Sequence, residues 1–147
     1  MHNFLDKISI GTANFGLDYG INNTGGKLSE DKISGIIDSA KILNIYALDT
    51  AFSYGHAHEE LFKLDINHFE VTTKINCLDT IEISKLRKKI ILHQNKISPN
   101  KPLNLLIHDT DKLSTNEIIN ALENINTLKA EGILSQTGIS IYSPDIL

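Results

Sequence analysis

The sequence predicts an α/β fold in which parallel strands alternate with helices. Short apolar runs alternate with segments of helical periodicity along the chain, which is the pattern of repeated βαβ units. The 147 residues are 41% hydrophobic and 22% charged, and this composition suits one globular domain with a substantial core. Gly11, Gly16 and Gly20 have the wrong spacing for a dinucleotide-binding turn after the first strand. Their spacing favours a barrel of β/α units over a doubly wound sheet.

The first β/α unit is expected near the N-terminus. Residues 8–10 form the first strand, which Gly11 closes, and residues 12–28 form a long loop rich in Gly and Asn. Ser29 can cap the helix that follows, and the acidic first turn suits the positive end of the helix dipole. The buried stripe of this helix has helical spacing and consists of Ile33, Ile36, Ile37, Ala40 and Leu43.

The next two units follow the same order. Residues 45–48 form a second strand that ends at Asp49, and a helix begins near His58. Residues 69–73 form a third strand that ends at Lys74. The third helix lies before Pro99, and its apolar positions are Ile83, Leu86, Ile90 and Ile97.

The fourth unit carries the clearest helix signals. Residues 103–107 form a strand that ends at His108. Ser114 and Glu117 have the spacing of a capping box, and Gly132 stands where a helix C-terminus favours a left-handed residue. The buried stripe of the helix between them consists of Ile118, Ala121, Leu122, Ile125 and Leu128.

The repeated pattern continues beyond this helix. Residues 137–140 close a short fifth strand, and Ser143-Pro144 has the form of a helix start. A complete (β/α)8 TIM barrel needs about 250 residues. We therefore expect residues 1–147, with about five strands and four helices, to form an incomplete (β/α)8 barrel, as a fragment, a truncated product or a half that needs a partner. Self-association is expected because a half barrel leaves strand edges unpaired.

Polar side chains follow three consecutive strands. Asp49, Lys74 and His108 are each the first polar residue after an apolar strand, and Tyr54 lies in the loop after Asp49. Each residue alone could simply mark a turn or a solvated strand end. In a (β/α)8 barrel, however, the carboxyl ends of the strands form the active site. We therefore expect the four side chains to converge.

This set of side chains suits the reduction of a carbonyl group. A tyrosine phenol has a pKa near ~10, and a neighbouring ammonium such as that of Lys74 can lower it. Asp49 can hold Lys74 in place, and His108 can donate a hydrogen bond to a carbonyl oxygen. Hydride could then add to the carbonyl carbon while Tyr54 protonates the oxygen.

One segment of the chain resembles a known family. Residues 49–55, Asp-Thr-Ala-Phe-Ser-Tyr-Gly, followed by Glu59, resemble the Asp-Thr-Ala-x-x-Tyr-Gly signature of the aldo/keto reductases. The similarity extends from about residue 8 to residue 147 in the order of the family's strands. Its other matches are Gly11-Thr12, Phe15-Gly16, Thr73-Lys74, Leu106-Ile107-His108 and Gly138-Ile139-Ser140.

The resemblance implies that residues 1–147 form the N-terminal half of a (β/α)8 barrel that uses NADPH to reduce a small carbonyl substrate and needs no metal. It implies that Tyr54 is the general acid, that Lys74 tunes it, that Asp49 supports Lys74 and that His108 orients the substrate. Ile141 stands where the family usually has an asparagine that holds the carboxamide. The positions that match contacts to the nicotinamide end of NADPH are Gly11, Thr12, Asp49 and Ser140.

Two other readings of the sequence are open. The chain could be a non-catalytic reductase fragment or a half-barrel assembly module that keeps the four side chains by descent. His56 and His58, beside Glu59, could instead form part of a zinc site, since His and carboxylate groups bind zinc. No third ligand is evident from the pattern, and solvated loop histidines fit better.

Net charge and cysteine content limit the kinds of binding partner and the cellular compartment that we expect. The net charge of −4 gives no footprint for nucleic acid or anionic membrane. Cys77 is the only cysteine, so no internal disulfide can form, and this suits a reducing compartment such as the cytoplasm. Neither a signal peptide nor a membrane span is expected from the apolar runs.

Overall fold

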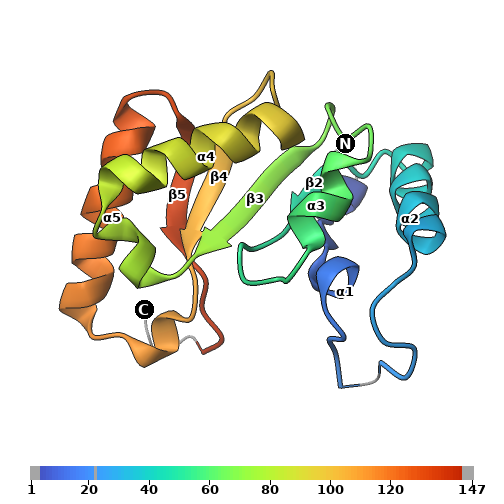
Figure 1. The fold of residues 1–147 in the computed structure, drawn as a ribbon, viewed down its shortest axis with the longest axis horizontal. Helices are drawn as coiled ribbons and strands as arrows, with labels where there is room; N and C mark the ends of the chain where they lie inside the picture. Colours follow the sequence, from blue (N-terminus) through green and yellow to red (C-terminus); the bar gives the residue numbers. More distant parts are fainter. Residues whose placement is uncertain (1–3, 22, 144–147) are drawn as a thin grey trace.

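The computed structural model describes residues 4–21 and 23–143, which build one parallel sheet flanked by helices (Figure 1). The sheet has five strands in the order β1-β2-β3-β4-β5, so strands that follow one another in the sequence are also neighbours in space. This order, with every pair parallel, confirms the predicted β/α units. The strands are β1 (Ile10–Gly11), β2 (Ala47–Asp49), β3 (Glu70–Ile75), β4 (Leu103–Ile107) and β5 (Leu134–Ile139).

Helices connect the successive strands. The five α-helices are α1 (Ala13–Gly16), α2 (Glu30–Ile42), α3 (Ala57–Phe62), α4 (Ile83–Ile97) and α5 (Thr115–Ala130). Three short 3-10 helices are η1 (Phe4–Lys7), η2 (Cys77–Thr80) and η3 (Thr110–Lys112). The long helices lie where the apolar stripes predict them. The one-turn helix α1 lies within a segment that the sequence predicts to be loop, because a single turn carries no periodic signal.

The ends of α5 form as the sequence predicts. The Ser114 hydroxyl accepts a hydrogen bond from Glu117 N–H at 3.3 Å, and the Glu117 carboxylate accepts one from Ser114 N–H at 2.8 Å. These two bonds are the reciprocal capping box. After the helix, Gly132 has a φ of 75°, the left-handed conformation that a residue with a Cβ adopts only under strain.

Side chains of β3 alternate between the core and the opposite face of the sheet. Val71 and Ile75 are each 1% exposed and belong to the apolar core. Their neighbour Lys74 points to the other face, since successive side chains of a strand point to opposite sides. The apolar stripes of the helices cover the core side, and this leaves the polar alternate residues on the inner face of the sheet.

A hydrogen-bond network joins β3 and β4 on this inner face. The Asn104 amide donates to the Glu70 carboxylate at 2.7 Å and to the Thr72 hydroxyl at 3.3 Å. Glu70 and Thr72 are two residues apart, so they share a face of β3. The network therefore fixes the register at which the polar faces of the two strands meet.

The edges of the sheet are β1 and β5. Strand β1 is shorter than predicted and pairs with β2 at only two positions, Ile10 with Leu48 and Gly11 with Asp49. Within the described residues, neither β1 nor β5 has a strand on its outer side. The helix start expected at Ser143-Pro144 extends outside the described residues. In the described ranges, no helix is long and apolar enough to cross a membrane.

Candidate active site

Three of the four predicted polar residues lie at the carboxyl ends of adjacent strands, and Tyr54 lies in the loop after β2. Asp49 is the last residue of β2, Lys74 lies near the end of β3, and His108 directly follows β4. The carboxyl ends of the strands meet at one end of the sheet, where the arrowheads of β3, β4 and β5 converge (Figure 1). Lys74 is 6% exposed and His108 is 7% exposed, so both are largely withdrawn from solvent.

An ion pair joins β2 to β3. The Lys74 ammonium donates a hydrogen bond to the Asp49 carboxylate and another to the carbonyl of Thr50, at 3.2 Å. A buried ammonium needs such partners, because transfer of an unpaired charge from water is costly. Asp49 therefore holds Lys74 in a fixed position.

Tyr54 lies beside this ion pair and beside His108. The Lys74 Nζ atom is 5.3 Å from the centroid of the Tyr54 ring. The rings of Tyr54 and His108 meet edge to face, with centroids 5.9 Å apart. In the described part of the chain, the Tyr54 hydroxyl has no hydrogen-bond partner, so it is available to a substrate.

The electrostatic effect on Tyr54 differs from the sequence-based expectation. We expected Lys74 to lower the pKa of the phenol. Burial instead raises the pKa of Tyr54 above its ordinary value near ~10, and the Asp49 carboxylate adds to the increase. The main reason is that burial disfavours the charged phenolate, while the nearby Lys74 ammonium is already paired with Asp49. Tyr54 is therefore held in its protonated form, as a proton donor requires.

His108 is held by a serine that the sequence analysis did not single out. The Ser53 hydroxyl lies 3.2 Å from Nδ1 of His108, and His108 N–H donates to the Ile75 carbonyl at 2.7 Å. Burial lowers the pKa of His108, so the ring is neutral at neutral pH. If Ser53 donates to Nδ1, the proton of the neutral ring lies on Nε2, which can then donate to a carbonyl oxygen. Ser53 lies in the signature segment, at one of its variable positions.

Two glycines place the loop that carries Tyr54. A Cβ added to Gly16 would lie 1.8 Å from the Tyr54 carbonyl oxygen and 2.4 Å from the Ala57 nitrogen. Gly55 has a φ of 54°, and a Cβ there would lie 2.6 Å from the Gly16 carbonyl oxygen. The two backbone segments therefore touch without side chains between them. The sequence analysis matched Gly16 to the first strand exit but could not predict this contact, since the partners are far apart in the chain.

The four predicted cofactor positions also lie at the carboxyl ends of strands. Thr12 is fully buried, and its hydroxyl donates to the Asp49 carbonyl at 3.1 Å. Gly11 ends β1, and Ser140 follows β5 at the opposite edge of the sheet. Ser140 N–H donates to the Ile107 carbonyl at 2.9 Å, and the Ser140 carbonyl accepts from Thr110 at 2.7 Å. These bonds fix the Ser140 backbone and leave its hydroxyl available to a ligand.

The two histidines weighed as zinc ligands have different surroundings. The His56 side chain is 78% exposed, whereas His58 is 5% exposed and its Nε2 atom lies 3.2 Å from the Thr73 hydroxyl. Among the described residues, no three His, Cys, Asp or Glu side chains gather as metal ligands.

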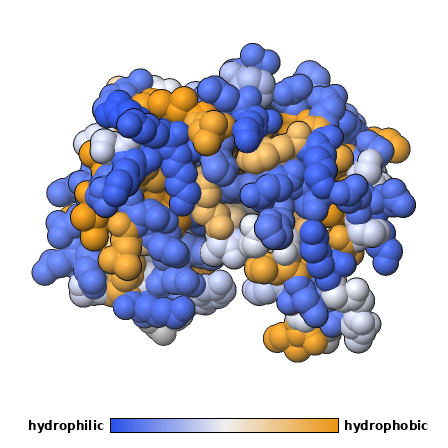
Figure 2. Space-filling view, in the orientation of Figure 1, coloured by the Kyte–Doolittle hydropathy of each residue, from blue (hydrophilic) through white to orange (hydrophobic). Residues whose placement is uncertain are grey.

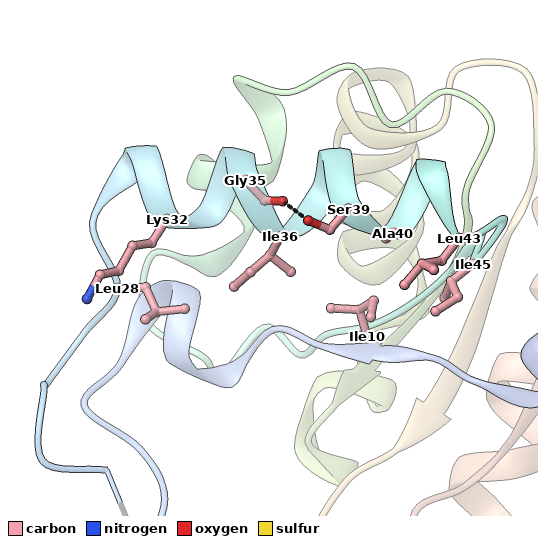
Figure 3. Close-up of a pocket in the computed structure, with 9 residues that line it drawn as sticks. All are labelled: Ile10, Leu28, Lys32, Gly35, Ile36, Ser39, Ala40, Leu43 and Ile45. Carbon is pink, nitrogen blue, oxygen red and sulfur yellow. Dashed lines mark hydrogen bonds between the residues drawn. The ribbon is translucent and has the colours of Figure 1, made fainter.

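A separate apolar groove lies along α2, and none of the four polar side chains lines it (Figure 3). Its volume is about 470 Å³. Ile10 forms one side, and the other side comes from α2 and the residues around it. The lining residues are Ile10, Leu28, Lys32, Gly35, Ile36, Ser39, Ala40, Leu43 and Ile45. The groove adjoins the free edge of β1.

Comparison with known proteins identifies the fold. No protein-family model and no curated protein matches the sequence. A solved protein of Pseudomonas aeruginosa assigned to the aldo-keto reductases superposes with a TM-score of 0.68 at 20% identity, over 90% of this chain and 54% of that chain. An apo aldo-keto reductase of Bacillus halodurans gives a TM-score of 0.56 at 22% identity, over 81% and 41%. A mutant of Gox0644 in complex with NADPH gives 0.61 at 15% identity, over 93% and 45%.

These similarities establish the architecture of the chain. Its five parallel strands, which alternate with helices, have the fold found in part of the aldo-keto reductase (β/α)8 barrel. The chain spans about half the length of the solved proteins that it matches. The fold class predicted from the sequence is thus confirmed as part of such a barrel.

Proposed function

We propose that the chain carries the proton-donating site of an NADPH-dependent reductase that acts on aldehydes or ketones. The observation that supports this proposal most strongly is the position of Tyr54. Its ring lies next to the Lys74 ammonium at 5.3 Å and next to the His108 ring at 5.9 Å. The similarity to the aldo-keto reductase fold agrees with this chemistry.

Tyr54 is the proton donor in the proposed reaction. NADPH, when bound, supplies the hydride that adds to the carbonyl carbon. The oxygen gains negative charge as this bond forms, and the Tyr54 hydroxyl gives it a proton. The Lys74 ammonium stabilises the resulting phenolate, while Asp49 keeps the ammonium in place.

His108 orients the carbonyl oxygen. With Nδ1 turned to Ser53 at 3.2 Å, the Nε2 atom of the neutral ring is the donor available to substrate. A neutral imidazole can donate a hydrogen bond to the carbonyl oxygen, but it is too weak an acid to replace Tyr54 as the proton donor. A positioned donor of this kind favours the transition state more than the ground state as charge develops on the oxygen.

The described residues fit the nicotinamide end of the cofactor. Ser140 has a fixed backbone, and its hydroxyl has no hydrogen-bond partner within the described residues. A Cβ added at Gly11 would meet no described heavy atom within 4 Å, which leaves room for a ring. The bond from the Thr12 hydroxyl to the Asp49 carbonyl joins the ends of β1 and β2.

A fluorescence titration with NADPH tests whether this chain builds a cofactor site. We expect saturable binding at micromolar concentrations, weakened several-fold by Ser140→Ala. The matched control is Ser135→Ala, which changes an exposed serine of β5, the strand that Ser140 follows. An absence of binding up to millimolar NADPH would contradict activity in this chain and favour a non-catalytic reductase fragment.

We propose self-association as a second function, on the evidence of the apolar groove. The groove borders the free edge of β1, and Leu43 on its rim is 50% exposed. The face of the molecule shown in Figure 2 is mainly hydrophilic, with scattered apolar patches such as the tip of the loop after α1. Apolar surface beside an unpaired strand favours contact with a second copy.

Sedimentation velocity over a range of concentrations tests this second function. We expect a concentration-dependent dimer that Leu43→Lys weakens. Leu92→Lys, which changes an apolar residue of α4 that is 56% exposed, is the matched control and leaves the dimer intact. A monomer at every concentration, or equal effects of the two variants, would exclude this assembly.

A further inference from the structure

A cluster of four aromatic and imidazole rings lies where α3, α4 and the loop that carries Tyr54 meet. His58 is 5% exposed, and its ring meets that of Phe52 edge-on with centroids 4.6 Å apart. His93 lies 4.6 Å from Phe52 and 5.1 Å from His58. Phe62 completes the set at 5.6 Å from His93. We call these four residues the ring cluster. The proposed chemistry uses none of them.

The ring cluster contacts the two segments that carry Tyr54 and Lys74. Phe52 lies two residues before Tyr54, and Phe52 N–H donates to the Lys74 carbonyl at 3.0 Å. The Thr73 hydroxyl lies 3.2 Å from Nε2 of His58. Because neighbouring strand residues point to opposite faces, Thr73 faces His58 whereas Lys74 faces Asp49.

Mostly cationic groups surround the ring cluster. From α4, the Lys89 Nζ atom lies 4.2 Å from the Phe52 centroid, and the Lys96 Nζ atom lies 5.0 Å from the Phe62 centroid. The acidic group near the cluster is Glu59 of α3, which raises the pKa of His93 and so opposes the effect of burial. The segments that bring Thr73 and Phe52 to the cluster contribute no charge to it.

This environment keeps His58 neutral. Burial lowers the pKa of His58 to about 4, with smaller contributions from His93 and Lys89. A proton on His58 would also face His93, whose own pKa is lowered mainly by burial. The packing of the rings and the bond to Thr73 therefore depend on an uncharged imidazole at this position.

We propose that His58 is a positioning residue, which through Phe52 and Thr73 holds the Tyr54 loop against the end of β3, and that protonation of the ring cluster in acid releases this loop. The inference rests on the proposed function, because it concerns how the proton donor is held for catalysis. It adds a group outside the site that controls the position of Tyr54, and it makes the site sensitive to acid.

Fluorine NMR of the chain labelled with fluorotyrosine tests this proposal without cofactor or turnover. The chain has four tyrosines, and Tyr54→Phe identifies the Tyr54 resonance. Tyr46, which is 41% exposed and packs against the buried Phe69 with ring centroids 5.6 Å apart, reports on another part of the fold. In the wild-type chain, we expect the Tyr54 resonance to shift between pH 6.5 and pH 4 while the Tyr46 resonance stays constant.

Three variants separate positioning from folding. His58→Leu removes the acid transition of the Tyr54 resonance and shifts that resonance at neutral pH. Thr73→Val, which keeps the side-chain shape, also shifts it at neutral pH and decides the matter if His58→Leu does not fold. His56→Leu, at a 78% exposed histidine, changes neither property.

The proposal is overturned by either of two results. One is a Tyr54 resonance that is the same in wild type, His58→Leu and Thr73→Val. The other is a wild-type acid transition in which Tyr54 and Tyr46 change together, since that reports global unfolding. Failure of NADPH to bind would contradict the proposed function and leave these readings unaffected, so the two failures are distinguishable.

Discussion

The Lys74 ammonium is bonded to the Asp49 carboxylate of the neighbouring strand, and this ion pair sets the charge that Tyr54 experiences. Burial raises the pKa of Tyr54 and the Asp49 carboxylate adds to the increase, so Tyr54 is held as a protonated phenol rather than as a phenolate. The site therefore suits proton donation, with the cation close enough to act once the proton leaves.

Replacing Asp49 is expected to lower the pKa of Tyr54. Asp49→Asn removes a charge that raises this pKa and releases Lys74 from its ion pair, and both changes favour the phenolate. Ultraviolet titration of phenolate, taken as the difference from the corresponding Tyr54→Phe chain, measures the effect. Asp65→Asn, at a carboxylate that is 67% exposed, is the control and leaves the titration unchanged. A Tyr54 pKa that rises in Asp49→Asn would contradict this assignment of charges.

Removing the cation is expected to destabilise the fold. Lys74→Met leaves the Asp49 carboxylate without its partner, and we expect a loss of about 2 kcal/mol in the free energy of unfolding. This value is below the cost for a fully buried pair, because the Asp49 side chain is 36% exposed. Urea denaturation measures the loss. Lys85→Met, which removes a pair on the surface of α4, should cost less than about 1 kcal/mol; equal losses would mean that Lys74 is no more than a surface charge.

The contact between Gly16 and the Tyr54 loop predicts a strong effect of a single methyl group. Gly16→Ala places a Cβ against the Tyr54 carbonyl and the Ala57 nitrogen, and we expect about 3 kcal/mol of destabilisation. Gly35→Ala is the matched control, because a Cβ there meets nothing within 4 Å and α2 gains helix propensity. We expect that control to be stabilised by about 0.5 kcal/mol. Thermal or urea unfolding of the two variants decides the matter, and equal stabilities would rule out the close contact.

Acid should weaken the fold through His58. The pKa of His58 is lowered from 6.5 to about 4 in the folded chain, so the unfolded chain binds the proton more tightly. Its contribution to stability is complete above pH 6.5 and decreases as the pH falls towards 4, by up to about 3 kcal/mol. Urea unfolding across this range measures the change. His58→Phe should flatten the profile, and a wild-type profile that is already flat would refute the prediction.

The sequence was sufficient to predict the sheet and the three polar strand ends. Apolar runs followed by Asp49, Lys74 and His108 define strands that end at one edge, and β4 begins and ends at the predicted residues. Long helices were predictable for the same reason, because their stripes are periodic over several turns.

Other parts of the site depend on contacts between distant segments. Gly16 touches the Tyr54 loop, and Ser53 lies 3.2 Å from a histidine 55 residues away in the chain. No local pattern predicts such pairs. The direction of the Tyr54 pKa was also not predictable, since it depends on burial and on which charge Lys74 has as its partner.

The most direct test of the central claim is to follow transfer of deuterium from NADPH labelled at the reactive position of the nicotinamide to benzaldehyde. Mass spectrometry of the benzyl alcohol detects even slow turnover by the 147-residue chain. We expect deuterated alcohol from the wild-type chain and from Tyr142→Phe, and at least about a hundredfold less from Tyr54→Phe. Deuterated alcohol formed equally by wild type and Tyr54→Phe, or by neither, would contradict the assignment of Tyr54 as the proton donor of a working reductase site.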